Sequence, residues 1–130
     1  MSKIRQLFAV LMLLFPLVGL SEEAAKEQKF AVAADGDQVT SAIAKLAGVA
    51  PFFHIYDSQG NLLEVLPNPH LDLEFGVGPA CAATLADKGV TVLVARQIPG
   101  PKMVDVLEAR EVRVVRRVGD VGDVAKELKE

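Results

Sequence analysis

The stretch 79-PACAATLADKGVTVLVARQI-98 decides the fold class, because a helix pattern in it runs directly into a buried-strand pattern. Residues 79–89 are helix-forming, with a proline suited to the first turn and a glycine suited to the stop. Residues 90–98 follow as an apolar run of strand length. Downstream, residues 100–111 predict a second helix and residues 112–118 a further strand. Strands alternating with helices in this way predict parallel crossovers.

Upstream of this stretch the pattern is that of strands joined by turns. Residues 29–35 form an apolar run that ends in an Asp-Gly-Asp turn, and residues 51–57 and 61–68 read as a hairpin. The connector 38–50 has only weak helical spacing, and residues 119–130 predict an amphipathic C-terminal helix. We therefore predict an α/β fold whose mixed five-stranded sheet has a three-strand antiparallel meander, then two parallel strands with crossover helices and a C-terminal helix.

Residues 1–21 are organised like a signal peptide. Lys3 and Arg5 precede an apolar run over residues 7–20, and Gly19 offers a small residue for processing. The run is shorter than the roughly 20 residues that a spanning helix needs. We expect a cleaved leader and a periplasmic or secreted protein, with an uncleaved N-terminal membrane anchor as the alternative.

Charge and cysteine content limit the function classes. Residues 22–28 are polar and predict a linker, which leaves residues 29–130 as a single domain. Without residues 1–21 the chain has 12 basic and 17 acidic residues, a net charge of −5. Such a chain lacks the concentrated basic surface that nucleic acids reward. The arginines at 110–117 fit a solvated strand edge better, and the single cysteine excludes an internal disulfide.

Five segments in order carry a resemblance to a known family: "KFAVAADGDQV", "GVAPFFHIYD", "NLLEVLPNPH", "GVGPACAATLADKGVTVLVA" and "PGPKMVDVLEAREVRVV". Together they resemble the dinitrogenase iron-molybdenum cofactor biosynthesis family over nearly all of residues 29–130. The resemblance implies a ribonuclease H-like fold with the first strand at the centre of the sheet. It also implies a small accessory domain that binds an iron-sulfur or iron-molybdenum cluster precursor and is not a catalyst. Its partners would be a cluster donor or acceptor protein, and the chain is a candidate homodimer.

One segment departs from the family pattern. Many relatives carry His-Phe-Gly-Arg-Ala-Pro before the second strand, whereas residues 46–51 read "LAGVAP" and keep Gly48, Ala50 and Pro51. A cluster ligand and an anion contact that the resemblance implies are therefore missing. Lys45 replaces part of the charge but is no substitute for imidazole as a metal ligand.

The glycines before the first predicted helix are candidate anion contacts. Gly76 and Gly78 would leave backbone N–H groups at the positive end of the helix dipole, where an anion such as a cluster or a phosphate is stabilised. Lys102 adds a positive charge at the next predicted helix. The run "GVGPAC" lacks the third glycine of a dinucleotide fingerprint. The alternative is that these glycines only permit a tight loop.

Cys81, His70 and His54 are the candidate metal ligands. Cys81 is expected in the first turn of the helix, where the dipole favours the thiolate that iron requires. The alternative is a buried cysteine packing as a small hydrophobe. His70 follows Pro69 toward the glycines, with an exposed loop histidine as the alternative. His54 lies in a strand pattern that also suits a packed histidine.

We expect a cleft between residues 76–81, the end of the first strand near Asp35, and residues 96–102. Two functions are consistent with it, a metallocluster carrier and a metal-free interaction module that has lost its ligands. A two-metal nuclease would need converging carboxylates, and Asp35, Asp57 and Glu64 are the only candidates. The acidic composition and the missing basic track argue against an enzyme of this kind.

Overall fold

The computed structural model describes residues 27–130. The predicted signal peptide and most of the predicted linker, residues 1–26, lie outside the described residues. Within residues 27–130 no helix has the length and apolar character needed to cross a bilayer.

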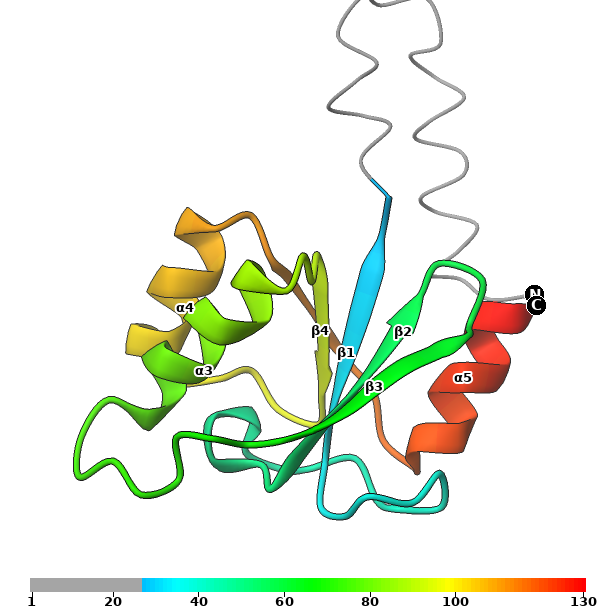
Figure 1. The fold of residues 1–130 in the computed structure, drawn as a ribbon, viewed down its shortest axis with the longest axis horizontal. Coiled ribbons are helices and arrows are strands. Elements are labelled where there is room, and N and C mark those ends of the chain that lie inside the picture. The colour runs from blue at the N-terminus through cyan, green and yellow to red at the C-terminus, as the bar shows by residue number, and fades with distance from the viewer. Residues whose placement is uncertain (1–26) are drawn as a thin grey trace, which may run out of the picture.

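The fold is a five-stranded sheet with helices on both faces (Figure 1). Its elements are β1 (Lys29–Ala34), a 3-10 turn η1 (Ala47–Val49), β2 (Phe52–Asp57), β3 (Leu62–Pro67), α3 (Val77–Asp87), β4 (Val92–Ala95), α4 (Pro101–Ala109), β5 (Arg113–Arg116) and α5 (Val121–Lys129).

The strand order is β3-β2-β1-β4-β5. β1 pairs antiparallel with β2 and parallel with β4, β2 pairs antiparallel with β3, and β4 pairs parallel with β5. This confirms the predicted meander, the two parallel strands and the central place of the first strand.

Three boundaries differ from the prediction. α3 begins at Val77, two residues before the proline expected to open it, because Gly76 adopts a left-handed conformation (φ 75°) that turns the chain into the helix. The strand expected over residues 90–98 is limited to β4 (Val92–Ala95): its first three residues pair with both β1 and β5, and Ala95 pairs with β5 alone. The connector 38–50 forms the short turn η1 and no α-helix.

Two hydrophobic clusters hold the layers together, one on each face of the sheet. α3 and α4 cover one face and α5 covers the other (Figure 1). β1 supplies both clusters in alternation, because successive side chains of a strand point to opposite faces. Phe30 and Val32 pack with α5, whereas Ala31 and Ala33 pack with α3 and α4. Within residues 27–130, both clusters lie between residues 30 and 128, so the described segment contains a hydrophobic core of its own, as a domain does.

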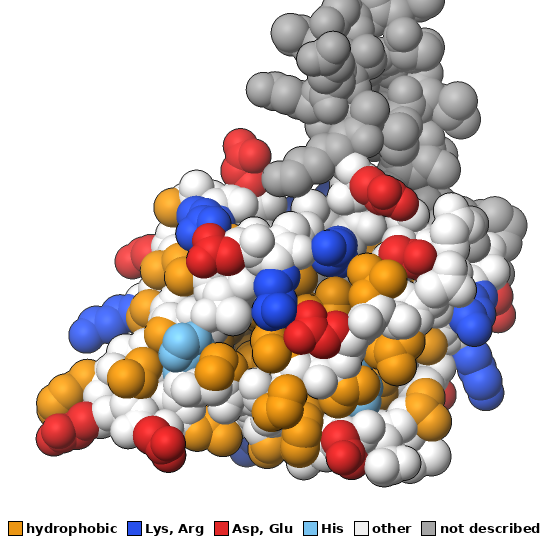
Figure 2. All heavy atoms as spheres, viewed as in Figure 1, with side chains coloured by type: hydrophobic (Ala, Val, Ile, Leu, Met, Phe, Trp, Pro, Cys, Tyr) orange, Lys and Arg blue, Asp and Glu red, His pale blue; other side chains and the backbone are white. Residues whose placement is uncertain are grey.

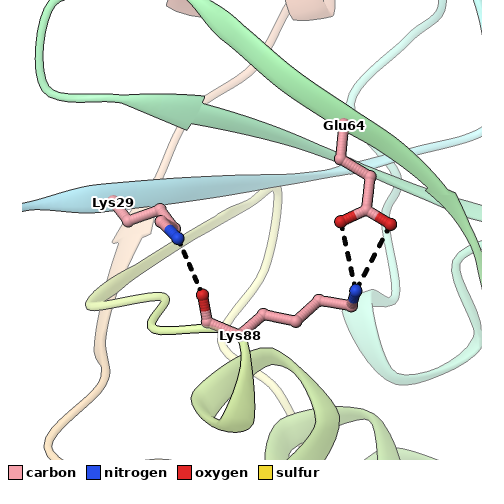
Figure 3. Close-up of polar contacts among 3 residues, drawn as sticks. All are labelled: Lys29, Glu64 and Lys88. Carbon is pink, nitrogen blue, oxygen red and sulfur yellow. Dashed lines mark hydrogen bonds and ion pairs between the residues drawn. The ribbon is translucent and has the colours of Figure 1, made fainter.

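A polar seam joins the C-terminal end of α3 to the sheet (Figure 3). Lys29 Nζ donates a hydrogen bond to the Lys88 carbonyl (2.9 Å), and Lys88 Nζ pairs with Glu64 of β3 (3.1 Å). A cation at the last carbonyls of a helix is stabilised by the helix dipole. The seam fixes the C-terminal end of α3 near the start of β1. The N-terminal end of α3 therefore lies at the opposite edge of the sheet, where β1 ends.

Candidate functional site

A groove of about 430 Å³ opens where both crossover helices begin. β1 and β4 run parallel, so their carboxyl ends lie at the same edge of the sheet, the lower edge in Figure 1. Such an edge is where open α/β sheets bind ligands. The groove is lined by η1 with the residues before it, the first residues of α3 and the loop into α4, namely Lys45–Val49, Gly78, Pro79 and Ile98–Met103.

Two glycines let the walls of the groove approach each other. A Cβ atom on Gly48 would lie 3.1 Å from the Cα atom of Gly78, and one on Gly78 would lie 3.3 Å from the Cβ atom of Met103. Contacts this short favour glycine at both positions, because a side chain would push its neighbour away by a few tenths of an ångström. The Met103 side chain, buried beneath this contact, therefore forms part of the floor.

Both helix N-termini at the groove lack a side-chain cap. The N-cap residues are Gly76 for α3 and Gly100 for α4, and neither has a side chain to accept the first N–H groups. By contrast, α5 begins with a capping box in which Asp120 and Asp123 exchange hydrogen bonds with each other's backbone N–H. The α3 and α4 termini thus direct uncapped N–H groups and positive dipole ends toward the groove, an arrangement that favours anions.

The charge of the lining is positive. Lys45 and Lys102 are its only charged residues, and both are exposed. Among residues 27–130, neither forms an ion pair. The rest of the lining is apolar apart from backbone, so the groove combines apolar walls with two cations and two helix N-termini.

Cys81 lies behind the groove and does not line it. It is the fifth residue of α3, so its expected place in the first turn was wrong, because the helix begins earlier than predicted. Its buried Sγ donates to Asn68 Oδ1 (3.2 Å) and approaches the Gly48 carbonyl (3.5 Å). Burial raises the pKa of the Cys81 thiol, and the bond to Asn68 lowers it by less. This environment favours the neutral thiol, contrary to the expected dipole-stabilised thiolate.

The two histidines lie in separate places. His70 Nε2 is 2.7 Å from Thr84 Oγ1, on the flank of α3, and its backbone N–H donates to Asn68. His54 is buried on the α5 side of the sheet, with Nε2 2.9 Å from the Gly36 carbonyl. Cys81 packs on the α3 side. The sheet therefore separates His54 from Cys81.

No group of three or more His, Cys, Asp or Glu side chains able to hold a metal ion occurs within residues 27–130. The assignment of Cys81, His70 and His54 as metal ligands stays a prediction. In this fold His54 and Cys81 lie on opposite faces of the sheet and are not placed to share one ion.

The predicted cleft and the groove overlap in part. Gly78 and Lys102 line the groove, and Gly76 caps the helix beside it. Asp35, by contrast, does not line it. Sequence reasoning missed Met103 and the role of η1, because their contribution depends on a close approach between distant segments. The signal for η1 was present in the retained Gly48 of "LAGVAP".

Comparisons with known proteins bear on the fold and the family. A comparison with curated proteins finds no significant match. Among solved structures, the chain is similar to the apo form of the orange protein from Desulfovibrio gigas, with 26% identity and a TM-score of 0.69 over 76% of this chain and 84% of that one. It is also similar to a putative NifB protein of the DUF35 family from Thermotoga, with 30% identity and a TM-score of 0.64 over 77% and 84% of the two chains.

The ribonuclease H-like fold that the resemblance implied stays a prediction. The family model for dinitrogenase iron-molybdenum cofactor matches residues 28–130, which is all of the described chain apart from Glu27. The five-segment resemblance, the sheet order and this match agree, and the chain therefore belongs to the dinitrogenase iron-molybdenum cofactor family.

Proposed function

We propose that the groove binds an anionic iron-sulfur or iron-molybdenum cluster precursor and that the protein carries it between a donor and an acceptor protein. The observation that carries the proposal is the lining formed by residues 27–130, in which two uncapped helix N-termini and two lysines without an ion pair surround apolar walls that include no acidic residue. Such a site suits a soft anion with a sulfide surface. Membership of a cofactor family supports a role connected with clusters.

In this proposal the groove holds its ligand without a protein thiolate or imidazole. Within the described part of the chain, no cysteine or histidine lines it. Backbone N–H groups and the ammonium groups of Lys45 and Lys102 then neutralise the anion, and the cluster keeps its own ligands. An arrangement of this kind favours reversible loading, which a carrier needs.

The proposed role is binding and not catalysis. The carboxylates expected for a two-metal nuclease do not converge. Asp35 follows the carboxyl end of β1, whereas Asp57 lies opposite Lys29 in the β1–β2 ladder, at the amino end of β1. Glu64 is paired with Lys88. The second candidate function is a metal-free interaction module, which is favoured by the exposed Leu46 and Val49 at positions where the family resemblance places histidine and arginine.

Reconstitution tests the proposal directly. Residues 22–130, incubated with ferrous iron, sulfide and thiol without oxygen and then desalted, should retain iron and show visible charge-transfer absorption. Lys45→Gln/Lys102→Gln should weaken retention by about tenfold, because two cations near the anion are lost. The control Lys126→Gln/Lys129→Gln makes the same charge change on α5, across the sheet, and should bind like the parent. A colourless parent would shift the assignment to the metal-free module.

A complementary variant restores family residues at the groove. Leu46→His/Val49→Arg adds an imidazole and a guanidinium to the rim, where both replaced side chains are more than half exposed. Iron retention should rise above that of the parent because a ligand and a cation are added. The control Val118→Arg adds a cation at another exposed apolar site. Equal retention in all three proteins would show that η1 does not contact the cluster.

A further inference from the structure

The segment 71-LDLEF-75 is an exposed loop between β3 and α3. Its three apolar side chains are exposed, with Leu71 and Leu73 at 46% and Phe75 at 83%. They alternate with Asp72 and Glu74, which form no ion pair among residues 27–130. In Figure 2 the corner of the surface at lower left, where Figure 1 shows this loop, carries hydrophobic and acidic side chains next to each other. Three large apolar side chains exposed within five residues make this loop a candidate interaction surface.

The groove is complementary to this segment in both polarity and charge. Its rim exposes Leu46, Val49 and Ile98, each by more than half. Lys45 and Lys102 stand among these apolar side chains, and no acidic residue lines the groove. An apolar segment with two carboxylates therefore matches an apolar groove with two ammonium groups.

We propose that residues 71–75 of one molecule dock in the groove of a second copy. Gly76 directly follows the segment, and Gly78 lines the groove, so the segment and the groove lie at the same end of each molecule. A two-fold arrangement then satisfies both exchanges at once, since each copy offers one segment and one groove. Phe75 enters the apolar part of the partner's groove, and Asp72 and Glu74 face its lysines.

The chemistry favours a second copy over a membrane surface. Asp72 and Glu74 would be repelled by the anionic lipids that attract basic segments. A contact limited to one short segment per copy is small, so the dimer should be weak, with a dissociation constant of about 10 µM to 1 mM. The docked segment and a bound anion would occupy the same groove, so dimerisation and ligand binding should compete.

Charge reversal with mixing tests the dimer. The protein to use is residues 22–130, which contain both hydrophobic clusters. Sedimentation velocity at concentrations of about 10 µM to 1 mM should show a monomer–dimer equilibrium, and added salt should weaken the dimer. Asp72→Lys/Glu74→Lys and Lys45→Glu/Lys102→Glu should each be monomeric, because the segment and the groove then carry like charges. An equimolar mixture of these two variants should dimerise again, since both exchanges are once more between opposite charges.

A second pair of variants tests the apolar contact. Phe75→Ser should weaken the dimer by at least about tenfold, because a buried aromatic side chain is lost. The control Val118→Ser, at a site 76% exposed and distant in sequence from both surfaces, should leave it unchanged. A parent that stays monomeric throughout, reversals that leave the dimer intact, or a mixture that stays monomeric would each overturn the proposal. These measurements use no metal, so their failure is separate from failure of the cluster proposal.

Discussion

At the scale of single residues, Cys81 shows how surroundings decide between two roles that the sequence leaves open. A cysteine at a helix start is a metal-ligand candidate, and a cysteine on an apolar stripe is a core candidate. In the structure the thiol is buried and donates a hydrogen bond to Asn68 Oδ1. The Asn68 side-chain N–H in turn donates to the Ala50 carbonyl. Because Cys81 also approaches Gly48, it supports η1 from behind the groove.

The raised pKa of Cys81 predicts a pH dependence of stability. Its neutral thiol is favoured in the folded state, so the unfolded chain loses the proton first as the pH rises. The free energy of unfolding should therefore decrease between about pH 8 and pH 10. Urea unfolding across this range should show a smaller decrease for Cys81→Ala than for the parent. An identical slope in both proteins would contradict the buried-thiol assignment.

Cys81→Ser separates the two roles in the cluster assay. If Cys81 is a ligand, as the sequence suggested, the variant loses most of the retained iron. The lining of the groove instead predicts that retention persists, since Cys81 lies outside it. Reconstitution of the variant beside the parent, with both midpoints of unfolding measured, distinguishes loss of a ligand from loss of stability.

The sequence locates those site residues that have a local signal, as Gly78 and Lys102 show. Gly78 and Lys102 were predicted because they mark helix starts, and helix starts have local signals. Met103 was not predicted, since a methionine on a helical stripe gives no sign that two glycines will pack over it. Close approach between η1 and α3 is a tertiary property without a local signature.

At the scale of elements, sequence patterns located every strand and α-helix of the described chain but not the 3-10 turn η1, and they located boundaries less well. Pro79 was expected in the first turn, and it lies there as the third residue of α3, but the helix begins two residues before it. The first turn tolerates proline, because its N–H groups have no acceptor within the helix. The conformation of Gly76 that decides the start cannot be read from composition alone.

The uncapped N-terminus of α4 predicts that adding a cap raises the stability of the fold and weakens anion binding. Gly100 has an ordinary extended conformation, and a Cβ there would meet no atom within 4 Å. Gly100→Asp should therefore cap α4 and raise the free energy of unfolding by about 0.5 kcal/mol. It should also weaken anion retention, because a carboxylate then occupies the helix N-terminus.

Asp120→Ala is the matched change at the capped helix. It should lower the free energy of unfolding by about 1 kcal/mol, since it removes one half of the capping box. Retention of iron should be unaffected, because α5 lies on the other face of the sheet. Urea unfolding and reconstitution of both variants provide the measurements. If Gly100→Asp instead lowers the free energy of unfolding, the first N–H groups of α4 are already satisfied in the parent.

At the scale of the whole molecule, topology was the most predictable property. Strand–helix alternation and the hairpin signals together allow few arrangements, and the family resemblance placed the first strand at the centre. The position of the groove follows from this order, since α3 and α4 both start at the carboxyl edge of the sheet. Its depth does not follow, because it is determined by the glycine contacts between η1, α3 and α4.

We further propose that the protein is exported and loses its leader. Lys3, Arg5 and the apolar run after them support this, and these residues lie outside the described part of the chain. Mass spectrometry of protein from its source cell should find a chain that begins shortly after Gly19. Recovery of intact Met1 in a soluble cytoplasmic fraction would contradict export.

The direction of β1 has a practical consequence for tethering. The described chain enters the sheet at Lys29, and β1 carries it over six residues, about 20 Å, to the edge where the groove opens. Anything attached ahead of residue 27, such as a fluorescent protein, an affinity bead or a bilayer, is thus joined at the far end of β1. Immobilisation through this end should leave the groove facing the solution, available to a ligand, a donor protein or a second copy.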